Sequence, residues 1–361
     1  MTALRLGTRG SALAMSQSGQ VADALRAATG REVELVEVVT AGDRSSAPVQ
    51  QLGVGVFVSA LRDALVAKEI DFAVHSYKDL PTAGHPGLHI AAVPQREDPR
   101  DALIARGGLT LAELPPGATV GTGAPRRIAQ LLALGLQLTV TPIRGNVDTR
   151  VGRVLGPAAD LDAVVLARAG LARLGRAAQI TETLDPMLML PAPAQGALAV
   201  ECRLDDTDLV ELLALLDHAP SRAAVTAERA FLATLEAGCS APVAAFAVIA
   251  EGEPVESHTE GGPVVAHTEG GPDGQGAGGA ATGRGDGGFG NDEIYLRGAV
   301  ISLDGDRDIR LSRTGTPAEA AEVGKALAAD LLELGADSIL GTPKESGART
   351  QNFGAQNDPH P

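Results

Sequence analysis

The chain is 361 residues long and 44% of its residues are hydrophobic, which is enough for two or three domains with ordinary cores. Aromatic residues make up only 2% and tryptophan is absent, so those cores must be built from alanine, leucine and valine. The formal net charge of −15 argues against general nucleic-acid affinity, because phosphate contacts need dense positive charge, but it leaves room for a small anion held by a local group of arginines.

The first hundred residues alternate strand signals with helix signals. A helix is predicted to begin after Ser11, which occupies an N-cap position, and to end at Gly30. Another helix is predicted around residues 56–65, where apolar side chains recur on one helical face. Short apolar or β-branched runs predict strands at residues 4–6, 33–39 and 71–75.

The same alternation continues to about residue 190. The pattern predicts strands at residues 119–122, 138–143 and 162–167, a helix beginning near Pro125 and another at 146–155. Strands that alternate with helices are typical of α/β sheets with helices on both faces, so two such units predict two lobes with a cleft between them. Ligands in sheets of this kind usually bind at the carboxyl ends of strands.

The remainder predicts a smaller α+β unit. A strand at 195–203 is followed by helices at 206–217 and 221–237, strands at 243–249, 294–303 and 308–314, and a helix at 317–335. The strands at 243–249 and 294–303 should form a hairpin. The predicted fold class is therefore α/β, with two lobes and a smaller α+β C-terminal domain.

Residues 251–291 interrupt this pattern. Eleven of the 21 residues 270–290 are glycine, and the hexapeptide His-Thr-Glu-Gly-Gly-Pro occurs at 258–263 and again at 267–272. Such a segment buries too little apolar surface to offset the entropy of ordering, so we predict a disordered insertion, and a flexible tail at 342–361. His258 and His267 allow a metal-binding alternative, but transition-metal sites usually need more convergent ligands, so no metal site is predicted.

Arginines recur where predicted strands end. Helix N-termini attract anions, and guanidinium groups bind carboxylates through paired hydrogen bonds. Any one of these arginines alone is more often a solvated surface residue, but their repetition at successive strand ends favours a carboxylate-binding cleft. The residues at these turns are Arg9 and Ser11, Arg126 and Arg127, and Arg144, with Arg150 in the helix that follows.

Lys78 and Asp79 lie in the loop after the strand at 71–75. Adjacent residues of opposite charge in a loop more often form a surface ion pair than a catalytic site. The apolar strand before them raises the weight of the catalytic alternative only modestly. His75, at the end of that strand, is predicted to pack or to form hydrogen bonds rather than to catalyse.

The two cysteines differ in their surroundings. Cys202 lies within a predicted strand and fits an inert, buried thiol, whereas Cys239 lies on a Gly/Pro-rich loop after a helix, a position that favours reactivity. Two cysteines cannot form a disulfide framework and the N-terminus shows no signal core, so a cytoplasmic protein is predicted. No run approaches about 18 apolar residues, so no membrane span is predicted.

Together these segments resemble the porphobilinogen deaminase family, closely over about residues 4–250 and loosely over 293–340. Each motif is weak alone, but their shared order and spacing make the resemblance specific. The matching segments are residues 6–11 (LGTRGS), 39–43 (VTAGD), 75–81 (HSYKDLP), 96–101 (REDPRD), 121–127 (GTGAPRR), 144–147 (RGNV), 195–197 (QGA) and 236–242 (EAGCSAP).

The resemblance implies three domains. Domain 1 would comprise residues 1–97 and 196–217 and carry the catalytic aspartate, and domain 2 would comprise residues 98–195. Both would resemble the lobes of periplasmic binding proteins. Domain 3 would comprise residues 218–341 and carry the cofactor cysteine, with the insertion at 251–291 inside it.

The resemblance also implies a transferase of tetrapyrrole biosynthesis. The enzyme would condense four porphobilinogen molecules, release four ammonia molecules and hydrolyse the product to hydroxymethylbilane. Its cofactor would be one dipyrromethane, made from the substrate and joined to Cys239 by a thioether. The family resemblance favours a monomer. It also allows a hand-off of product to uroporphyrinogen-III synthase, and it implies no nucleic-acid or membrane partner.

Residue roles follow from the matched positions. Asp79 aligns with the catalytic carboxylate, which would stabilise the cationic azafulvene left when ammonia departs. Two positions depart from the family pattern: Ala124 stands where a serine is common, and Val54 where a lysine is often seen. The acid groups of cofactor and substrate would be held by Arg9, Ser11, Lys78, Arg126, Arg127, Arg144, Arg150, Arg173 and Gln195.

A second hypothesis is a two-lobed solute-binding protein without catalytic chemistry. It would share the lobes and the arginine-lined cleft, but it has no need of Cys239 or of the Lys78–Asp79 pair. The mass of the purified protein separates the two hypotheses, because the enzyme should be heavier than its sequence by two pyrrole units.

Overall fold

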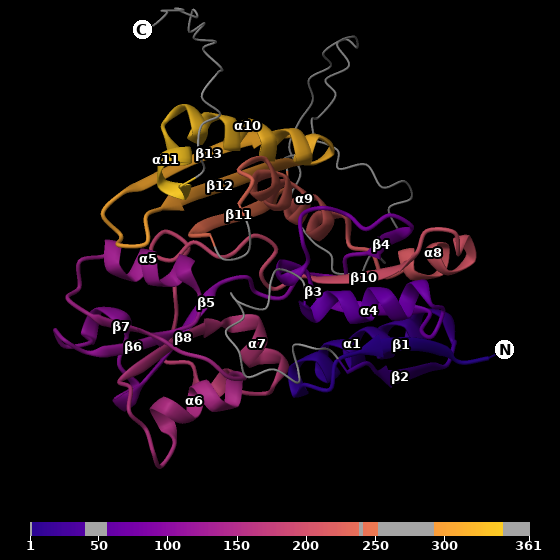
Figure 1. Ribbon diagram of the computed structural model, residues 1–361, viewed down its shortest axis with the longest axis horizontal. Coiled ribbons are helices and arrows are strands. Elements are labelled where there is room, and N and C mark those ends of the chain that lie inside the picture. The colour runs from indigo at the N-terminus through magenta and orange to yellow at the C-terminus, as the bar shows by residue number, and fades with distance from the viewer. Residues whose placement is uncertain (1, 40–55, 238–240, 252–291, 342–361) are drawn as a thin grey trace, which may run out of the picture.

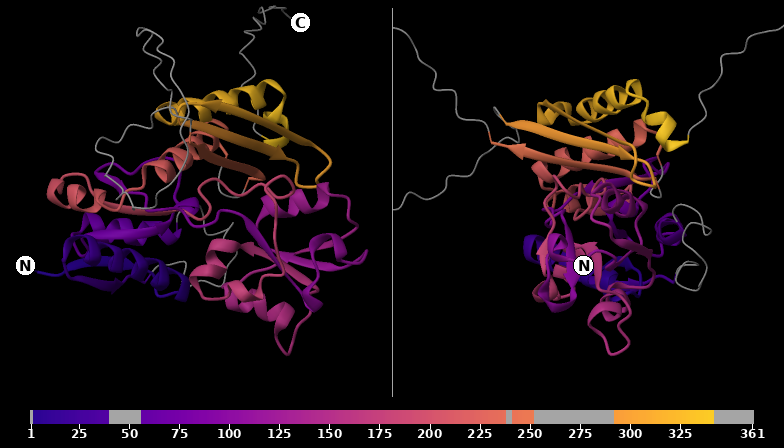
Figure 2. Two further views of the ribbon diagram at one scale, coloured as in Figure 1. Left: turned by 180° about the vertical axis from the view of Figure 1, so that it is seen from behind. Right: turned by 90° about the vertical axis from the view of Figure 1, so that its left-hand side faces the viewer.

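The computed structural model describes residues 2–39, 56–237, 241–251 and 292–341, and these residues form three sheets (Figure 1). Two lobes lie side by side, and the third sheet lies above them (Figure 2). Several sequence predictions fall outside the described residues: most of the motif at 39–43, the departure at Val54, the tether Cys239, the insertion at 252–291 and the tail at 342–361.

The first lobe is a mixed sheet of order β2-β1-β3-β10-β4. β1 runs parallel to β2 and β3, whereas β10 is antiparallel to both β3 and β4. Helices α1 and α8 share one hydrophobic cluster with the strands, and α4 belongs to a separate one. The elements are β1 (Leu4–Thr8), α1 (Ala12–Thr29), β2 (Val33–Glu37), α4 (Val56–Val66), β3 (Phe72–Ser76), β4 (Leu88–Ala92), β10 (Leu198–Arg203) and α8 (Thr207–Ala214).

The second lobe repeats this plan with the order β7-β6-β8-β5-β9. β6 is parallel to β7 and β8, while β5 is antiparallel to β8 and β9. Two hydrophobic clusters make up its core. The elements are β5 (Asp101–Ala105), β6 (Thr119–Thr122), α5 (Pro125–Ala133), β7 (Thr139–Pro142), α6 (Val147–Leu155), β8 (Ala163–Ala167), α7 (Arg168–Arg173) and β9 (Glu182–Thr183).

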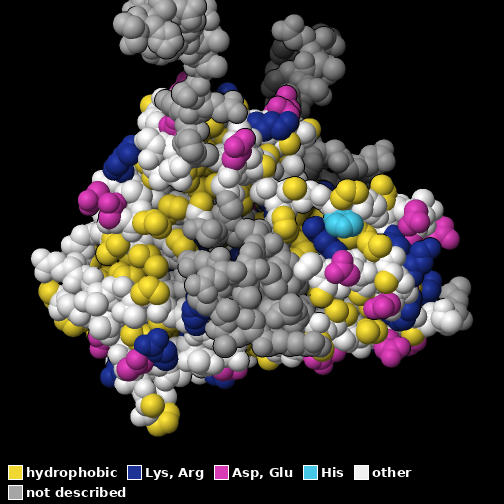
Figure 3. Space-filling view, in the orientation of Figure 1, with side chains coloured by type: hydrophobic (Ala, Val, Ile, Leu, Met, Phe, Trp, Pro, Cys, Tyr) yellow, Lys and Arg dark blue, Asp and Glu magenta, His cyan; other side chains and the backbone are white. Residues whose placement is uncertain are grey.

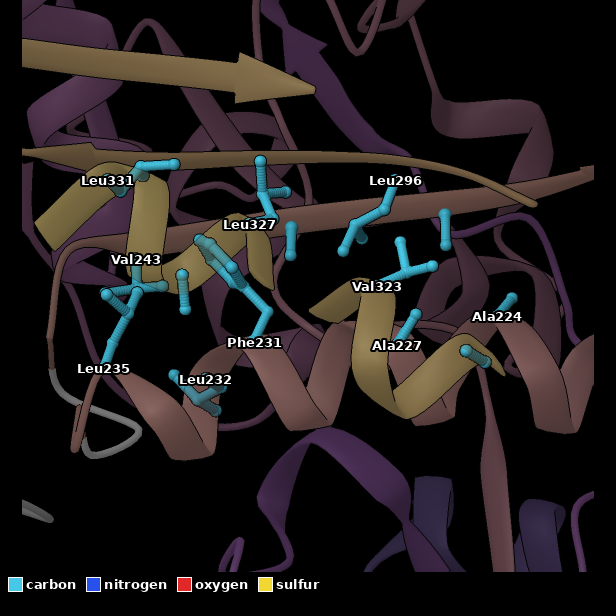
Figure 4. Close-up of a cluster of buried hydrophobic side chains, with 14 of the residues drawn as sticks. Ala224, Ala227, Phe231, Leu232, Leu235, Val243, Leu296, Val323, Leu327 and Leu331 are labelled. Atoms are coloured by element: carbon cyan, nitrogen blue, oxygen red, sulfur yellow. The ribbon is translucent and has the colours of Figure 1, made fainter. Parts of the chain in front are cut away.

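The third sheet is antiparallel, with β12 between β11 and β13, and helices α9 and α10 pack on it (Figure 4). Phe231 of α9 fills the space above Gly298 of β12, where an added Cβ would lie 2.5 Å from the ring, so only glycine fits there. Val243 pairs with Val300, which confirms the predicted hairpin. The elements are α9 (Ala219–Thr234), β11 (Val243–Ala250), β12 (Glu293–Ile301), β13 (Asp308–Gly315), α10 (Ala320–Glu333) and α11 (Ala336–Leu340).

The predicted fold class is confirmed, and local signals account for most element bounds. The side chain of Ser11 accepts a hydrogen bond from the backbone N–H of Ala14, and Gly30 ends the helix with a left-handed φ of 66°. The helix predicted at 317–335 is observed as α10, preceded directly by a 3₁₀ turn over Pro317–Glu319. Strands β4 and β5 were not predicted.

Two linker segments, residues 93–100 and 190–197, join the lobes and meet at Gly196. Gly196 has a φ of +86°, and a Cβ there would lie 2.4 Å from the carbonyl oxygen of Glu97. Glu228 of α9, which is fully buried, binds both linkers: its carboxylate pairs with Arg96 at 2.7 Å and accepts the backbone N–H of Ala194 at 2.6 Å. The C-terminal sheet and its helices are therefore attached directly to the two linkers between the lobes. The division at residues 97, 195 and 217 stays a prediction.

None of the helices described is both long enough and apolar enough to cross a membrane. On the face shown in Figure 3, the described Lys and Arg side chains are interspersed with Asp and Glu rather than gathered into one broad basic patch. Positive charge gathers instead inside a cavity between the lobes.

Candidate active site

A cavity of about 800 Å³ lies between the two lobes, at the carboxyl ends of their strands. Lobe 1 contributes residues that follow β1 and β3 and residues of α1, and lobe 2 contributes residues that follow β6, β7 and β8. Of the residues predicted from the sequence, the lining includes Arg9, Ser11, Lys78, Asp79, Arg127, Arg144, Arg150 and Arg173.

The lining is strongly basic, with six Arg and Lys side chains against two carboxylates among the described residues. One of those carboxylates, Asp148, is already paired with Arg176 at 2.5 Å. Burial lowers the pKa of Arg150 and of Arg173, although a guanidinium stays charged at any physiological pH. Cations held in a partly dry cavity are stabilised by anions that enter it, so the site suits a ligand rich in carboxylates.

Asp79 lies on a short 3₁₀ turn, Tyr77–Asp79, directly after β3. The backbone N–H of Tyr77 donates to Ala197 at 3.0 Å, which ties the turn to the residue before β10. The Asp79 side chain is exposed towards the cavity that it lines. A carboxylate at this position can stabilise the positive charge of a cation that forms inside the cavity.

Lys78, on the same turn, donates a hydrogen bond to the linker at residues 190–197. Its Nζ lies 3.2 Å from Oε1 of Gln195, which is itself almost fully buried beneath the cavity. Burial lowers the pKa of Lys78 to about 8, although the neighbouring Asp79 acts in the opposite direction. Lys78 is therefore a cation whose charge can change near neutral pH.

A buried ion cluster lies under the arginine-lined wall. Asp101 is fully buried and accepts from Arg126 at 2.8 Å, from Arg127 at 2.8 Å and from Nε2 of Gln195 at 2.7 Å. Burial alone would raise the pKa of Asp101, but the two arginines outweigh it and hold that pKa far below its usual range. Asp101 thus fixes the side chains that shape this wall.

The structure separates Arg126 from its neighbour. Arg127 lines the cavity, whereas Arg126 is 4% exposed, binds Asp101 and the carbonyl of Leu190, and lies below the lining. These contacts suit a residue that holds the wall in place. A direct bond from Arg126 or Gln195 to a ligand stays a prediction.

Helix N-termini point into the same region, as the strand–turn–helix pattern predicts. Asn146 caps α6 by accepting the N–H of Thr149 at 2.8 Å, and Arg150 donates back to the carbonyl of Gly145 at 2.9 Å. Ala124 is the N-cap of α5 and supplies no side-chain cap.

Several site residues were not identified from the sequence. Gln17 and Ser76 line the cavity and bind each other at 3.0 Å, yet neither belongs to a charged or Gly-rich motif that would single it out. Asp101 is the last residue of the motif at 96–101, but its hydrogen-bond partners lie 25 to 94 residues away in the sequence. His75 is buried, with its Nε2 3.1 Å from a Glu201 carboxylate oxygen, in agreement with its predicted packing role.

Comparison with protein families identifies this arrangement. The model for "porphobilinogen deaminase, dipyromethane cofactor binding domain" matches residues 4–211, which include both lobes, and the model for the C-terminal domain of the same family matches residues 222–256. The chain belongs to the porphobilinogen deaminase family. It is 57% identical to the porphobilinogen deaminase of Nocardia farcinica, over 97% of this chain and 92% of that protein. It is 56% identical to that of Mycobacteroides abscessus, over 94% and 99%.

Two of the solved structures that match over part of the chain are named as binding proteins. The methionine binding protein MetQ matches with a TM-score of 0.36 and 13% identity, over 59% of this chain and 89% of that one. A periplasmic substrate-binding protein from Coxiella burnetii matches with a TM-score of 0.38 and 15% identity, over 60% and 93%. Similarity at this level does not bear on activity.

Proposed function

We propose that this member of the porphobilinogen deaminase family, a transferase, joins four porphobilinogen molecules head to tail, with loss of four ammonia molecules, and releases hydroxymethylbilane. The observation that carries the proposal is the cavity itself, where one catalytic candidate, Asp79, lines the same cavity as five arginines. Each porphobilinogen brings an acetate and a propionate, so a growing chain needs many cationic partners. This explains a basic cavity inside an acidic protein.

The residues present fit a dipyrromethane cofactor. Its acid groups match guanidinium donors that burial has partly stripped of water, and the cavity of about 800 Å³ is within the usual range for ligand sites. Arg127, Arg144 and Arg150 of lobe 2 would hold those acids, with Lys78 and Arg9 opposite them. When bound, the cofactor would supply the terminal pyrrole carbon to which the first substrate ring is joined, and each later ring would be joined to the ring added before it.

The protein's own contribution is electrostatic and geometric. Asp79 stabilises the positive charge that develops as ammonia leaves the substrate, while the arginines hold the substrate acids so that the reacting carbons meet. The low-dielectric protein around the cavity strengthens both effects. We also propose a cytoplasmic monomer that passes its product to uroporphyrinogen-III synthase; the free thiol of Cys202 supports a reducing compartment.

Intact mass spectrometry combined with an ammonia-release assay tests this function. We expect the purified protein to be heavier than its sequence by two pyrrole units and to release one ammonia for each porphobilinogen consumed. A protein of unmodified mass that binds porphobilinogen reversibly, without releasing ammonia, would instead be a solute-binding protein.

The lowered pKa of Lys78 predicts a pH dependence. As the pH rises through about 8, Lys78 loses its proton and with it the attraction for a cofactor acid, whereas an arginine at this position stays charged. We expect protein lacking the cofactor to load it from porphobilinogen more slowly above pH 8, and the Lys78→Arg variant to lose less of its rate. Mass-monitored time courses at pH 7 to 9 measure this. Parallel losses in both proteins would show that another group titrates.

Two arginines of lobe 2 should respond differently to replacement by leucine. Arg126→Leu removes one partner of the buried Asp101 carboxylate, and breaking a buried pair of this kind costs on the order of 3 kcal/mol of unfolding free energy. Arg144→Leu affects an exposed residue of the cavity lining, so we expect almost no change in stability but poorer cofactor loading. Denaturant unfolding and intact mass, measured on both variants, separate the two effects. Equal stability of the two variants would contradict the placement of Arg126.

A further inference from the structure

Arg229 reaches from α9 of the third domain to the turn that carries Asp79. Its Nη1 donates to the carbonyl oxygens of Tyr77 at 3.2 Å and Leu80 at 3.1 Å, and its Nη2 donates to that of Pro81 at 2.5 Å. The guanidinium also lies over the Tyr77 ring, with its Cζ 4.5 Å from the ring centroid. One side chain therefore contacts the turn both before and after Asp79.

The turn has little regular structure to hold it otherwise. It is a three-residue 3₁₀ helix whose side chains are not fully buried, and the N–H of Leu80 closes it on Tyr77 at 3.2 Å. Short 3₁₀ turns have poor hydrogen-bond geometry, so the groups that bind their carbonyls help to fix their conformation. Tyr77 and Leu80 pack in hydrophobic clusters on either side of Asp79, and Arg229 binds three carbonyls in and beside the same turn.

We propose that Arg229 is a positioning residue, which fixes the Asp79 carboxylate relative to the point where the cofactor is attached. This rests on the proposed function. Helix α9 ends at Thr234, only five residues before Cys239, so one helix both holds the catalytic turn and leads to the tether. The guanidinium acts through the turn and has no contact with substrate in this scheme.

Helix α9 also offers a matched control. Arg222, two turns before Arg229, donates to the carbonyls of Ile90 at 3.4 Å and Ala91 at 3.0 Å and pairs with Asp217 at 2.8 Å. It joins the same helix to the same lobe through the same kind of contact. Its two carbonyl partners lie on β4, and neither they nor Asp217 belong to the lining of the cavity.

The test compares Arg229→Leu with Arg222→Leu in the full-length, cofactor-loaded protein. Both variants should lose thermal stability. Only Arg229→Leu should lower kcat, by about 10- to 100-fold, because a displacement near 1 Å at the reacting centre has effects of that size. Its KM should stay within about twofold, its adduct mass should equal that of the unmodified protein, and heavier species should accumulate during turnover. Arg229→Lys, which keeps the charge but not the fork, should have an intermediate kcat.

A double-mutant cycle with Asp79→Asn decides whether Arg229 acts through Asp79. If it does, adding Arg229→Leu to Asp79→Asn lowers kcat little further, whereas two independent effects would multiply and overturn the proposal. An Arg229→Leu protein with normal kcat overturns it as well and leaves the proposed function standing. If Arg229→Leu does not fold, a normal kcat in Arg229→Lys has the same meaning. Failure of the unmodified protein to carry an adduct or release ammonia would instead refute the proposed function.

Discussion

Cys239→Ala is expected to yield a folded protein that carries no pyrrole adduct and has no measurable turnover. The reason is that the other thiol in the sequence is unsuited to attachment. Cys202 lies within β10 with no exposed surface, and burial raises the pKa of its thiol to about 11, an effect that the nearby Asp206 reinforces. A buried thiol that stays protonated is neither reachable nor nucleophilic. Cys239, which lies outside the described residues, is therefore the thiol that we propose forms the thioether.

The control for this experiment is Cys202→Ala. Removing one buried sulfur from a packed sheet costs stability, of order 1 kcal/mol, but it should leave the adduct mass and turnover unchanged. Intact masses of the two variants, recorded beside the unmodified protein, give the answer directly. An adduct that persists in Cys239→Ala and disappears in Cys202→Ala would reverse the assignment.

Local chemistry explains how much of the site could be predicted. Ser11 and Asn146 cap the helices that follow strands, and Arg9 and Arg144 lie in the same turns. Within each lobe such turns gather at one edge of the sheet, where the carboxyl ends of its parallel strands meet, and the cavity lies where these edges of the two lobes face each other. A pattern of strand, polar turn and helix is therefore enough to predict a basic cavity, although it cannot say which lobe each residue faces.

Long-range polar contacts explain what could not be predicted. Asp101, Arg126 and Gln195 form one buried network, but each belongs to a different segment and none has a periodic neighbour that would reveal the others. From the sequence, Arg126 and Arg127 are indistinguishable members of one motif. Only packing shows that Arg126 binds the buried Asp101 carboxylate below the lining, whereas Arg127 binds that carboxylate and also lines the cavity.

The same limit applies to the third domain. Its hairpin and helices follow from alternation and amphipathic patterns, but nothing local indicates that Glu228 binds both linkers or that Arg229 binds the catalytic turn. These neighbours on α9 point to partners 34 to 152 residues away. Contacts of that range connect the domains, and they are fixed by the docking of whole elements rather than by local sequence.

Asp79→Asn is expected to lower kcat by on the order of 10² to 10³, the usual result of removing one electrostatic stabiliser of a transition state. The replacement keeps the size of the side chain and removes its charge, so the departing ammonia leaves a cation without its counter-charge. Binding of the substrate acids depends on the arginines instead, so KM should change far less than kcat. Steady-state kinetics and mass spectra of the working enzyme measure both quantities, and species heavier by whole pyrrole units should accumulate.

Asp148→Asn provides the matched control for that experiment, because Asp148 is the other carboxylate among the described residues that line the cavity. Its charge is already paired with Arg176 at 2.5 Å, so little of it is available to a cation in the centre of the cavity. We expect its kcat to stay within a few-fold of the unmodified enzyme. If the two variants lose activity equally, the effect comes from the total negative charge of the cavity and not from the position of Asp79 on its turn. If only Asp79→Asn is impaired, the location of that one carboxylate, at the end of β3 and opposite the arginines, is what the reaction requires.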